Sequence, residues 1–322
     1  MTSKIAIASL VLAASGAVQA EVIADFNAVA ARTATPPPGA VYPAVTPEER
    51  RTVSFVDLAT VHLAVPRRTT CRGGAVGGFV PAAAGNPVWH FLPCMRTFTL
   101  ASPAQFRAEG PPPLDSVAYA EAFDEVKETG RSGGAALSPE QQEAARFHTE
   151  NPNLFGRASR VFMNQGSVLE NARLAAMLQV SIGDAIFGCF DSKYFHDAWR
   201  PRAAIPAAAS DGNPATIAEG GWAPYAASPN HPEYPSGHTC IASAVAEVVK
   251  SYYGTPRVPF TWTSTVTGTA RSYDSVQEMI REIKNARVHG GMHFRYSNDD
   301  GATLGRRTAH WVVRNYFRPT GG

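Results

Sequence analysis

The sequence predicts an all-α protein built as a helical bundle. Apolar residues recur at helical spacing in several segments, helix-capping signals precede some of them, and strand-like alternation is weak. Of the 322 residues, 44% are hydrophobic and 10% aromatic, which suffices for a buried core and excludes disorder as the main state. The formal net charge is +2, which argues against nucleic-acid binding through bulk charge. Any bound anion must therefore be held by a few placed cations.

Two helices are expected in the first half of the chain. Asp115 can cap the first, and Gly130 can end it. The second begins at Ser138 with a capping box and a proline at the first helical position, and it runs toward His148.

Four further helices are expected in the second half, because apolar residues recur there at intervals of three and four. Short strand-like pieces are expected only at 53–65 and 259–266. The four helices are a long buried one through Leu174 to Cys189, one through Ile241 to Val249 that ends at Gly254, and the segments 274–285 and 303–317.

The first twenty residues are expected to be a signal peptide. Lys4 gives a positive start, Ile5 to Val18 is largely apolar, and small residues precede an expected cleavage site before Glu21. The apolar run is short for a membrane span, and we expect no later transmembrane helix and no stable membrane insertion. The chain is therefore expected to be secreted or periplasmic.

The mature chain is expected to fold as a single helical domain over 21–322. Within it, 21–165 forms an N-terminal helical part, and 166–318 carries the candidate site. The N-terminal part is expected to pack around the site and to shape access to it.

Four cysteines allow three complete disulfide pairings, between which the sequence does not choose. Cys71 and Cys94 flank a glycine-rich stretch and form the favoured bridge. Cys189 and Cys240 lie in apolar helical patterns, which favours two small buried thiols.

Lys193 and Arg200 form the first chemically informative motif. They lie seven residues apart, about two helical turns, so both can project from one face of a helix before Pro201. The alternative is a pair of surface cations that form ion pairs with Asp191 and Asp197.

The second motif is a tight turn, Pro235 to Gly237, that runs directly into an amphipathic helix. Ser236 can cap this helix, and the free amides at its start form an anion site that the helix dipole favours. Gly237 lets an oxyanion approach the backbone, and His238 would face the same anion. The alternative is an ordinary capped helix with a surface histidine.

The third motif places Arg287 six residues before His293, across the pair Gly290 and Gly291. The glycines suit close packing or a bent backbone. His289 and His293 also have the spacing of a metal-binding pair, but the intervening glycines are poor helix material and no suitable glutamate accompanies them. A divalent-metal site is therefore not expected here.

Together the three motifs follow the pattern K-x6-R-P, then P-S-G-H, then R-x5-H. Over about residues 165–318 the chain resembles the phosphatidic acid phosphatase type 2 / vanadium-dependent haloperoxidase superfamily, in its soluble haloperoxidase-like branch. Two positions depart from the pattern, since Ala286 replaces the usual serine and Ser297 stands where the family commonly has aspartate. That acid would orient the imidazole of His293 and fix its tautomer, and Asp299 and Asp300 are candidate substitutes.

The resemblance implies a helical bundle with a site for a tetrahedral oxyanion, either vanadate or phosphate. The expected anion-binding residues are Lys193, Arg200, Ser236, Gly237 and Arg287. With vanadate as cofactor, the resemblance implies that His293 is the vanadium ligand, Lys193 polarises bound hydrogen peroxide for attack by halide, and His238 handles the peroxide proton. With a phosphate monoester, His293 would form a phosphohistidine and His238 would protonate the leaving alcohol.

His231 favours the first of these alternatives, although the same residue would also suit simple packing beside Pro232 and Pro235. It lies seven residues before His238, where the chain resembles family bromoperoxidases rather than chloroperoxidases, which carry phenylalanine. We therefore expect a vanadium-dependent haloperoxidase whose partners are hydrogen peroxide and halide, with bromide or iodide ahead of chloride. An acid phosphatase acting on phosphate monoesters is the second hypothesis. A non-catalytic oxyanion-binding protein, suggested by Ser297, is the third.

Overall fold

The structure is a computed structural model that describes residues 76–81, 87–149, 155, 159–163 and 167–317. The expected signal peptide, the strand-like piece at 53–65 and Cys71 lie outside these residues. Export, the disulfide to Cys94 and the division of the mature chain into two parts therefore stay predictions.

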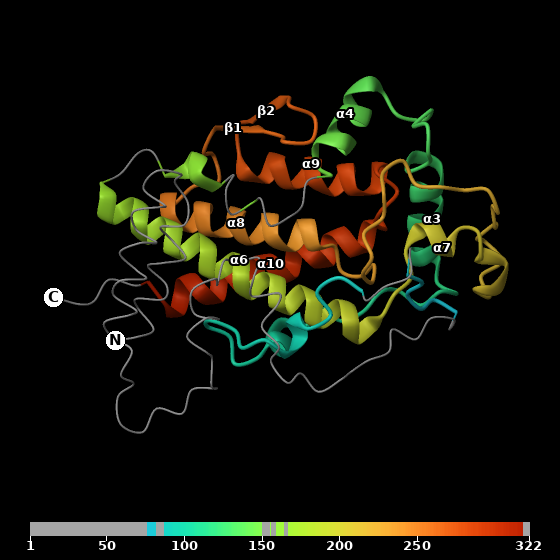
Figure 1. The fold of residues 1–322 in the computed structure, drawn as a ribbon, viewed down its shortest axis with the longest axis horizontal. Helices are drawn as coiled ribbons and strands as arrows, with labels where there is room; N and C mark the ends of the chain where they lie inside the picture. The colour runs from blue at the N-terminus through green and yellow to red at the C-terminus, as the bar shows by residue number, and fades with distance from the viewer. Residues whose placement is uncertain (1–75, 82–86, 150–154, 156–158, 164–166, 318–322) are drawn as a thin grey trace, which may run out of the picture.

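Four long helices form the body of the molecule, and the prediction of an all-α bundle is confirmed (Figure 1). Helix α8 packs against the other three, and α6 also packs against α10. Their bounds are α6, Val168–His196; α8, Gly237–Tyr253; α9, Val276–His289; and α10, Arg295–Asn315.

Shorter elements surround this body. Helix α4 and a two-stranded antiparallel hairpin lie over α9, whereas α3 and α7 lie at one end of the bundle (Figure 1). Their bounds are α3, Val117–Thr129; α4, Pro139–Phe147; α7, Pro201–Ala204; β1, Phe260–Thr263; and β2, Ala270–Tyr273; the 3-10 helices are η3, Leu92–Cys94; η4, Pro103–Phe106; η6, Ser159–Phe162; and η7, Ala208–Ser210.

Helix α6 is the central core helix. A capping box formed by Ser167 and Glu170 begins it, and nearly all residues from Leu174 to Lys193 are buried. By length and composition it could cross a membrane, but 94% of its most apolar window is buried inside the protein. Its apolar character therefore serves the packing of the bundle.

Several helices begin or end at other residues than expected, because caps and tertiary contacts set their ends and the apolar spacing does not reveal these. Ser116, rather than Asp115, caps α3, and its hydroxyl accepts from the amide of Tyr119. The capping box at Ser138 and the helix end at Gly130 are confirmed. Helix α9 continues past 285 to His289, and α10 begins at Arg295 rather than near 303, because its polar first turns pack beside the buried helix ends.

Helices α8 and α10 approach each other closely at two glycines. A Cβ atom on Gly305 would lie 1.8 Å from the carbonyl oxygen of Cys240, and one on Gly301 would lie 2.6 Å from the carbonyl oxygen of Ser236. Only glycine allows this contact, so α10 supports the first turns of α8 directly.

Cys189 and Cys240 are buried free thiols in a small cluster with Leu304, as predicted. Cys94 is exposed.

Candidate active site

The three sequence motifs lie close together in space, at a point where the ends of four helices are adjacent. The C-terminal ends of α6 and α9 and the N-terminal ends of α8 and α10 lie at one end of the bundle, near α3 and α7 (Figure 1). The amide of Ser236 donates to the carbonyl of Ser297 at 2.9 Å, which joins the starts of α8 and α10. Residues distant in the sequence are thereby brought into one buried region.

Lys193 and Arg200 converge on this region, but they do not share one helix. Helix α6 ends at His196, because Asp197 adopts a left-handed conformation, and Arg200 precedes α7 as its N-cap residue. The expected two-turn helical arrangement is therefore wrong. The surface ion-pair alternative is also wrong, since both cations are at most 1% exposed and Asp191 pairs with Arg107.

The ammonium of Lys193 is held by two backbone carbonyls. Its Nζ donates to the oxygens of Pro232 and Glu233, each at 2.9 Å. Burial lowers its pKa to about 8. An ammonium has three protons, so one donor remains beyond these two contacts.

Arg200 donates hydrogen bonds to the segments that contain the second and third motifs. Its Nε donates to the carbonyl of His231 at 2.9 Å, and its Nη1 donates to the carbonyl of Met292 at 2.9 Å. Its Nη2 lies 3.1 Å from Nδ1 of His231. The same Nδ1 also lies 3.1 Å from the carbonyl oxygen of Pro232, and burial lowers the pKa of His231 well below its usual value.

The turn at Ser236 leads into α8 as expected, with Gly237 and His238 in its first turn. Ser236 occupies the N-cap position, but its hydroxyl makes no capping bond, so that part of the prediction is wrong. Instead its buried Oγ has no hydrogen-bond partner among the described residues. His238 is 6% exposed and is not a surface histidine.

Space is open beside Gly237. A Cβ atom at this position would meet a single neighbour within 4 Å, the Cε of Lys193 at 3.9 Å. The glycine backbone, the lysine stem and the free amides of the helix start therefore border the same small volume.

Arg287 is buried in the last turn of α9, and one of its donors lacks a partner among the described residues. Its Nη1 donates to the carbonyl of His148 at 2.7 Å, and its buried Nε has no partner within the part of the chain that the structure describes. Burial and the nearby charge of Arg200 lower its pKa to about 9, which leaves it charged at neutral pH.

A network behind the site fixes the carbonyl that holds Arg287. The ring of His148 lies 2.8 Å from Oε1 of Glu282, which also accepts from Tyr273 and Arg271 at 2.6 and 2.8 Å. The sequence analysis missed this network, because its members come from the C-cap of α4, from β2 and from α9 and share no local pattern.

The glycine pair of the third motif does bend the backbone. Gly291 has a φ of +69°, and a Cβ atom there would lie 2.3 Å from the carbonyl oxygen of Gly130. The bend separates α9 from His293, which is buried at the start of the segment leading into α10. His289 remains on α9, and the described residues hold no metal-binding cluster of three or more histidine, cysteine or acidic side chains.

Glu233 is the site residue that the sequence analysis missed. Its Oε1 lies 2.8 Å from Nδ1 of His293 and accepts from the amide of Phe294 at 3.1 Å. Burial raises its pKa to about 7, and the charges of Lys193 and Arg200 oppose this shift. The available signal was an acidic residue inside the proline-rich run between His231 and the turn.

The two acids suggested as substitutes for Ser297 face elsewhere. Asp299 pairs with Lys284 at 2.8 Å, and Asp300 accepts from the hydroxyl of Tyr234 at 2.7 Å. The hydroxyl of Ser297 is itself buried and lies 3.4 Å from the carbonyl oxygen of Glu233.

The chain also resembles a known protein family in sequence. Residues 173–322 match the family model described as the VCPO second helical-bundle domain. These residues therefore resemble the vanadium haloperoxidase superfamily. The matched, haloperoxidase-type domain contains Lys193, Arg200, Arg287 and both candidate catalytic histidines. A search of curated proteins found no match.

Solved structures share the fold of this haloperoxidase-type domain. A bacterial vanadium-dependent iodoperoxidase aligns with a TM-score of 0.62 and 23% identity, covering 77% of this chain and 62% of its own. A bacterial vanadium-dependent chloroperoxidase in its holo form aligns with a TM-score of 0.59 and 20% identity, covering 74% of this chain and 57% of its own. The chain thus spans less than two thirds of the length of either protein.

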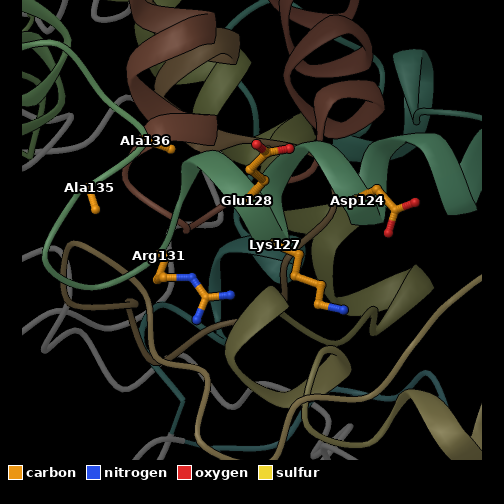
Figure 2. Close-up of a pocket in the computed structure, with 6 residues that line it drawn as sticks. All are labelled: Asp124, Lys127, Glu128, Arg131, Ala135 and Ala136. Atoms are coloured by element: carbon orange, nitrogen blue, oxygen red, sulfur yellow. The ribbon is translucent and has the colours of Figure 1, made fainter.

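A separate surface pocket lies at the C-terminal end of α3 (Figure 2). Its two basic residues are already engaged, since Lys127 donates to the carbonyl of Ile217 and Arg131 pairs with Glu219. None of the residues that line it belongs to the three motifs, so this pocket is not the candidate active site.

Proposed function

We propose that this protein is a vanadium-dependent haloperoxidase that oxidises bromide or iodide with hydrogen peroxide. The observation that carries the proposal is a buried group of three cations, Lys193, Arg200 and Arg287, around the N-terminus of α8. The match of residues 173–322 to the VCPO second helical-bundle domain supports the proposal. We further propose that the protein is exported, on the strength of the signal-peptide pattern.

The donor set fits vanadate. Two buried polar atoms, Oγ of Ser236 and Nε of Arg287, have no partner among the described residues, and a bound oxyanion would supply one. The open space beside Gly237 lets an anion reach the helix amides. Guanidinium groups suit paired oxygens, and three buried cations favour a highly charged anion.

Each residue would have a distinct role. Lys193, Arg200 and Arg287 would hold the oxyanion by charge, while Ser236 and the Gly237 amide would add neutral donors. His293 would be the vanadium ligand. Bound vanadate supplies a Lewis acid that activates hydrogen peroxide toward halide.

His238 would act as the acid–base group. It lies in the first turn of α8, next to Gly237, and is largely removed from solvent. There it could take a proton from a substrate oxygen and return it.

His231 supports bromide or iodide over chloride as the substrate. Its contact with Nη2 of Arg200, at 3.1 Å, places its imidazole beside an anion-binding cation. We therefore expect His231→Phe to change the ratio of bromide to chloride oxidation while vanadate affinity stays within about threefold, since the three cations remain.

The test is a paired assay. Purified protein loaded with orthovanadate should brominate a phenolic dye in the presence of hydrogen peroxide and bromide. No bromination, together with vanadate-inhibited hydrolysis of p-nitrophenyl phosphate, would instead identify an acid phosphatase, since the same cations and histidines serve that chemistry. Export is tested by sequencing the N-terminus of the protein recovered outside the cytoplasm, where residue 21 should come first.

The hypothesis of a non-catalytic binding protein loses its main support. It rested on Ser297 in place of an acid, but Glu233 supplies a carboxylate to His293.

A further inference from the structure

We propose that Glu233 is the positioning residue that fixes the tautomer of His293. The carboxylate would hold the proton on Nδ1, so that Nε2 keeps a lone pair for the bound oxyanion. The role of Nε2 rests on the proposed function, whereas the tautomer is a property of the protein alone.

The contact geometry assigns an acceptor to Nδ1. The Oε1 atom of Glu233 already accepts from the amide of Phe294 at 3.1 Å, and an amide can only donate. The same oxygen lies 2.8 Å from Nδ1 of His293, so with an ionised Glu233 the nitrogen must carry the proton for this bond to form.

The assignment also holds for a carboxyl group that is protonated on its second oxygen. That oxygen, Oε2, is buried and has no partner in the described part of the chain. A proton on Oε2 leaves the lone pairs of Oε1 to the amide of Phe294 and to Nδ1 of His293.

Burial and the surrounding cations both favour the neutral form of His293. Burial lowers its pKa well below the usual value, and the cations Arg200, Lys193 and Arg287 lower it further. A neutral imidazole has one proton to place, so the partner of Nδ1 decides which nitrogen is free.

Glu233 also connects the three motifs through its backbone. Its amide donates to the carbonyl of Ala198 at 2.9 Å, and its carbonyl accepts from Lys193 at 2.9 Å. The hydroxyl of Ser297, where the family pattern commonly has aspartate, lies 3.4 Å from that same carbonyl. In this chain the acid that faces His293 therefore stands just before the second motif, whereas the family pattern has it in the third.

The first test needs no variant and no ligand. Nitrogen-15 chemical shifts of labelled histidine in the protein without added anion report which ring nitrogen carries the proton, and His293→Gln identifies the signal. We expect the Nδ1–H tautomer. An Nε2–H tautomer in the native protein would overturn the proposal, whatever anion the site binds.

The second test separates positioning from charge. Removing a buried negative charge should by itself tighten the binding of every anion. If Glu233 fixes the tautomer, Glu233→Ala should instead weaken orthovanadate binding by about 10- to 100-fold, the usual effect of losing such a partner. Inorganic phosphate, which needs the cations but no bond to Nε2, should bind at least as tightly as before.

Glu233→Gln is the matched variant. Phe294 keeps an oxygen acceptor at the Oε1 position, so the Nδ1–H tautomer and the vanadate affinity should both survive the loss of charge. Asp184→Asn removes another buried carboxylate, one that binds the amides of Phe98 and Thr99, and should leave the ratio of vanadate to phosphate affinity unchanged.

Calorimetric titration of both anions against the four proteins decides the matter. A glutamine variant as weak for vanadate as the alanine variant would overturn the proposal, and so would an equal loss of both anions in Glu233→Ala. If native protein binds neither anion, the proposed function fails, while the tautomer measurement still decides the role of Glu233.

Discussion

Replacement of Arg287 by lysine measures how much of the anion affinity depends on guanidinium geometry. The native side chain has five N–H donors, of which one reaches the carbonyl of His148. Its Nε is buried without a partner among the residues described. The positive charge survives in Arg287→Lys, but the paired donors do not.

The expected loss follows from the unused donor. A hydrogen bond to a charged group contributes about 1.5–3 kcal/mol. Loss of one such bond to a bound oxyanion should therefore weaken phosphate binding by about 10- to 150-fold, since about 1.4 kcal/mol corresponds to a factor of ten.

Calorimetric titration with inorganic phosphate at pH 7 provides the assay. The control is Arg131→Lys at the surface pocket (Figure 2). It breaks a forked pair with Glu219 and should change the phosphate affinity less than about twofold. Phosphate affinity within about threefold of native in Arg287→Lys would refute the assignment of its free donors to the anion.

Three further predictions concern the same site and its support. Phosphate affinity should fall by up to about tenfold per pH unit above pH 8. Burial lowers the pKa of Lys193 to about 8, and this side chain attracts the anion only while it is protonated. A phosphate affinity that stays constant from pH 7 to 9.5 would contradict this. Gly305→Ala should destabilise the fold by about 1–3 kcal/mol in urea unfolding, because the new methyl group meets the carbonyl of Cys240; an unchanged midpoint would show that the helices can separate without cost. His293→Ala should abolish bromination yet still bind phosphate, and a fully active variant would show that the motif is misassigned.

Much of the fold follows from local signals. The capping box at Ser138, the helix end at Gly254 and the apolar spacing through Leu174 each depend on neighbouring residues, which a sequence displays directly. The start of α10 could not be found in this way, because its polar first residues are buried only through contacts with distant segments, as at Ser297.

The residues of the candidate site also fall into those that local motifs reveal and those that only the tertiary fold reveals. Lys193, Arg200 and His293 stand in motifs whose order and spacing are visible, and the structure buries all three in one region. The partner of His293 lies sixty residues earlier in the chain, at Glu233. No periodicity links the two, so only the tertiary fold identifies the pair.

The close contact of α8 with α10 limits how this site can be altered. Gly301 and Gly305 are already the smallest residues, and a Cβ atom on them would meet the main-chain oxygens of Ser236 and Cys240 and the hydroxyl oxygen of Thr239. On the α10 side of this contact there is therefore no side chain that could be shortened. Engineering for a bulkier oxyanion would instead act on a neighbouring side chain such as Phe155, whose ring centroid lies 6.1 Å from that of His238.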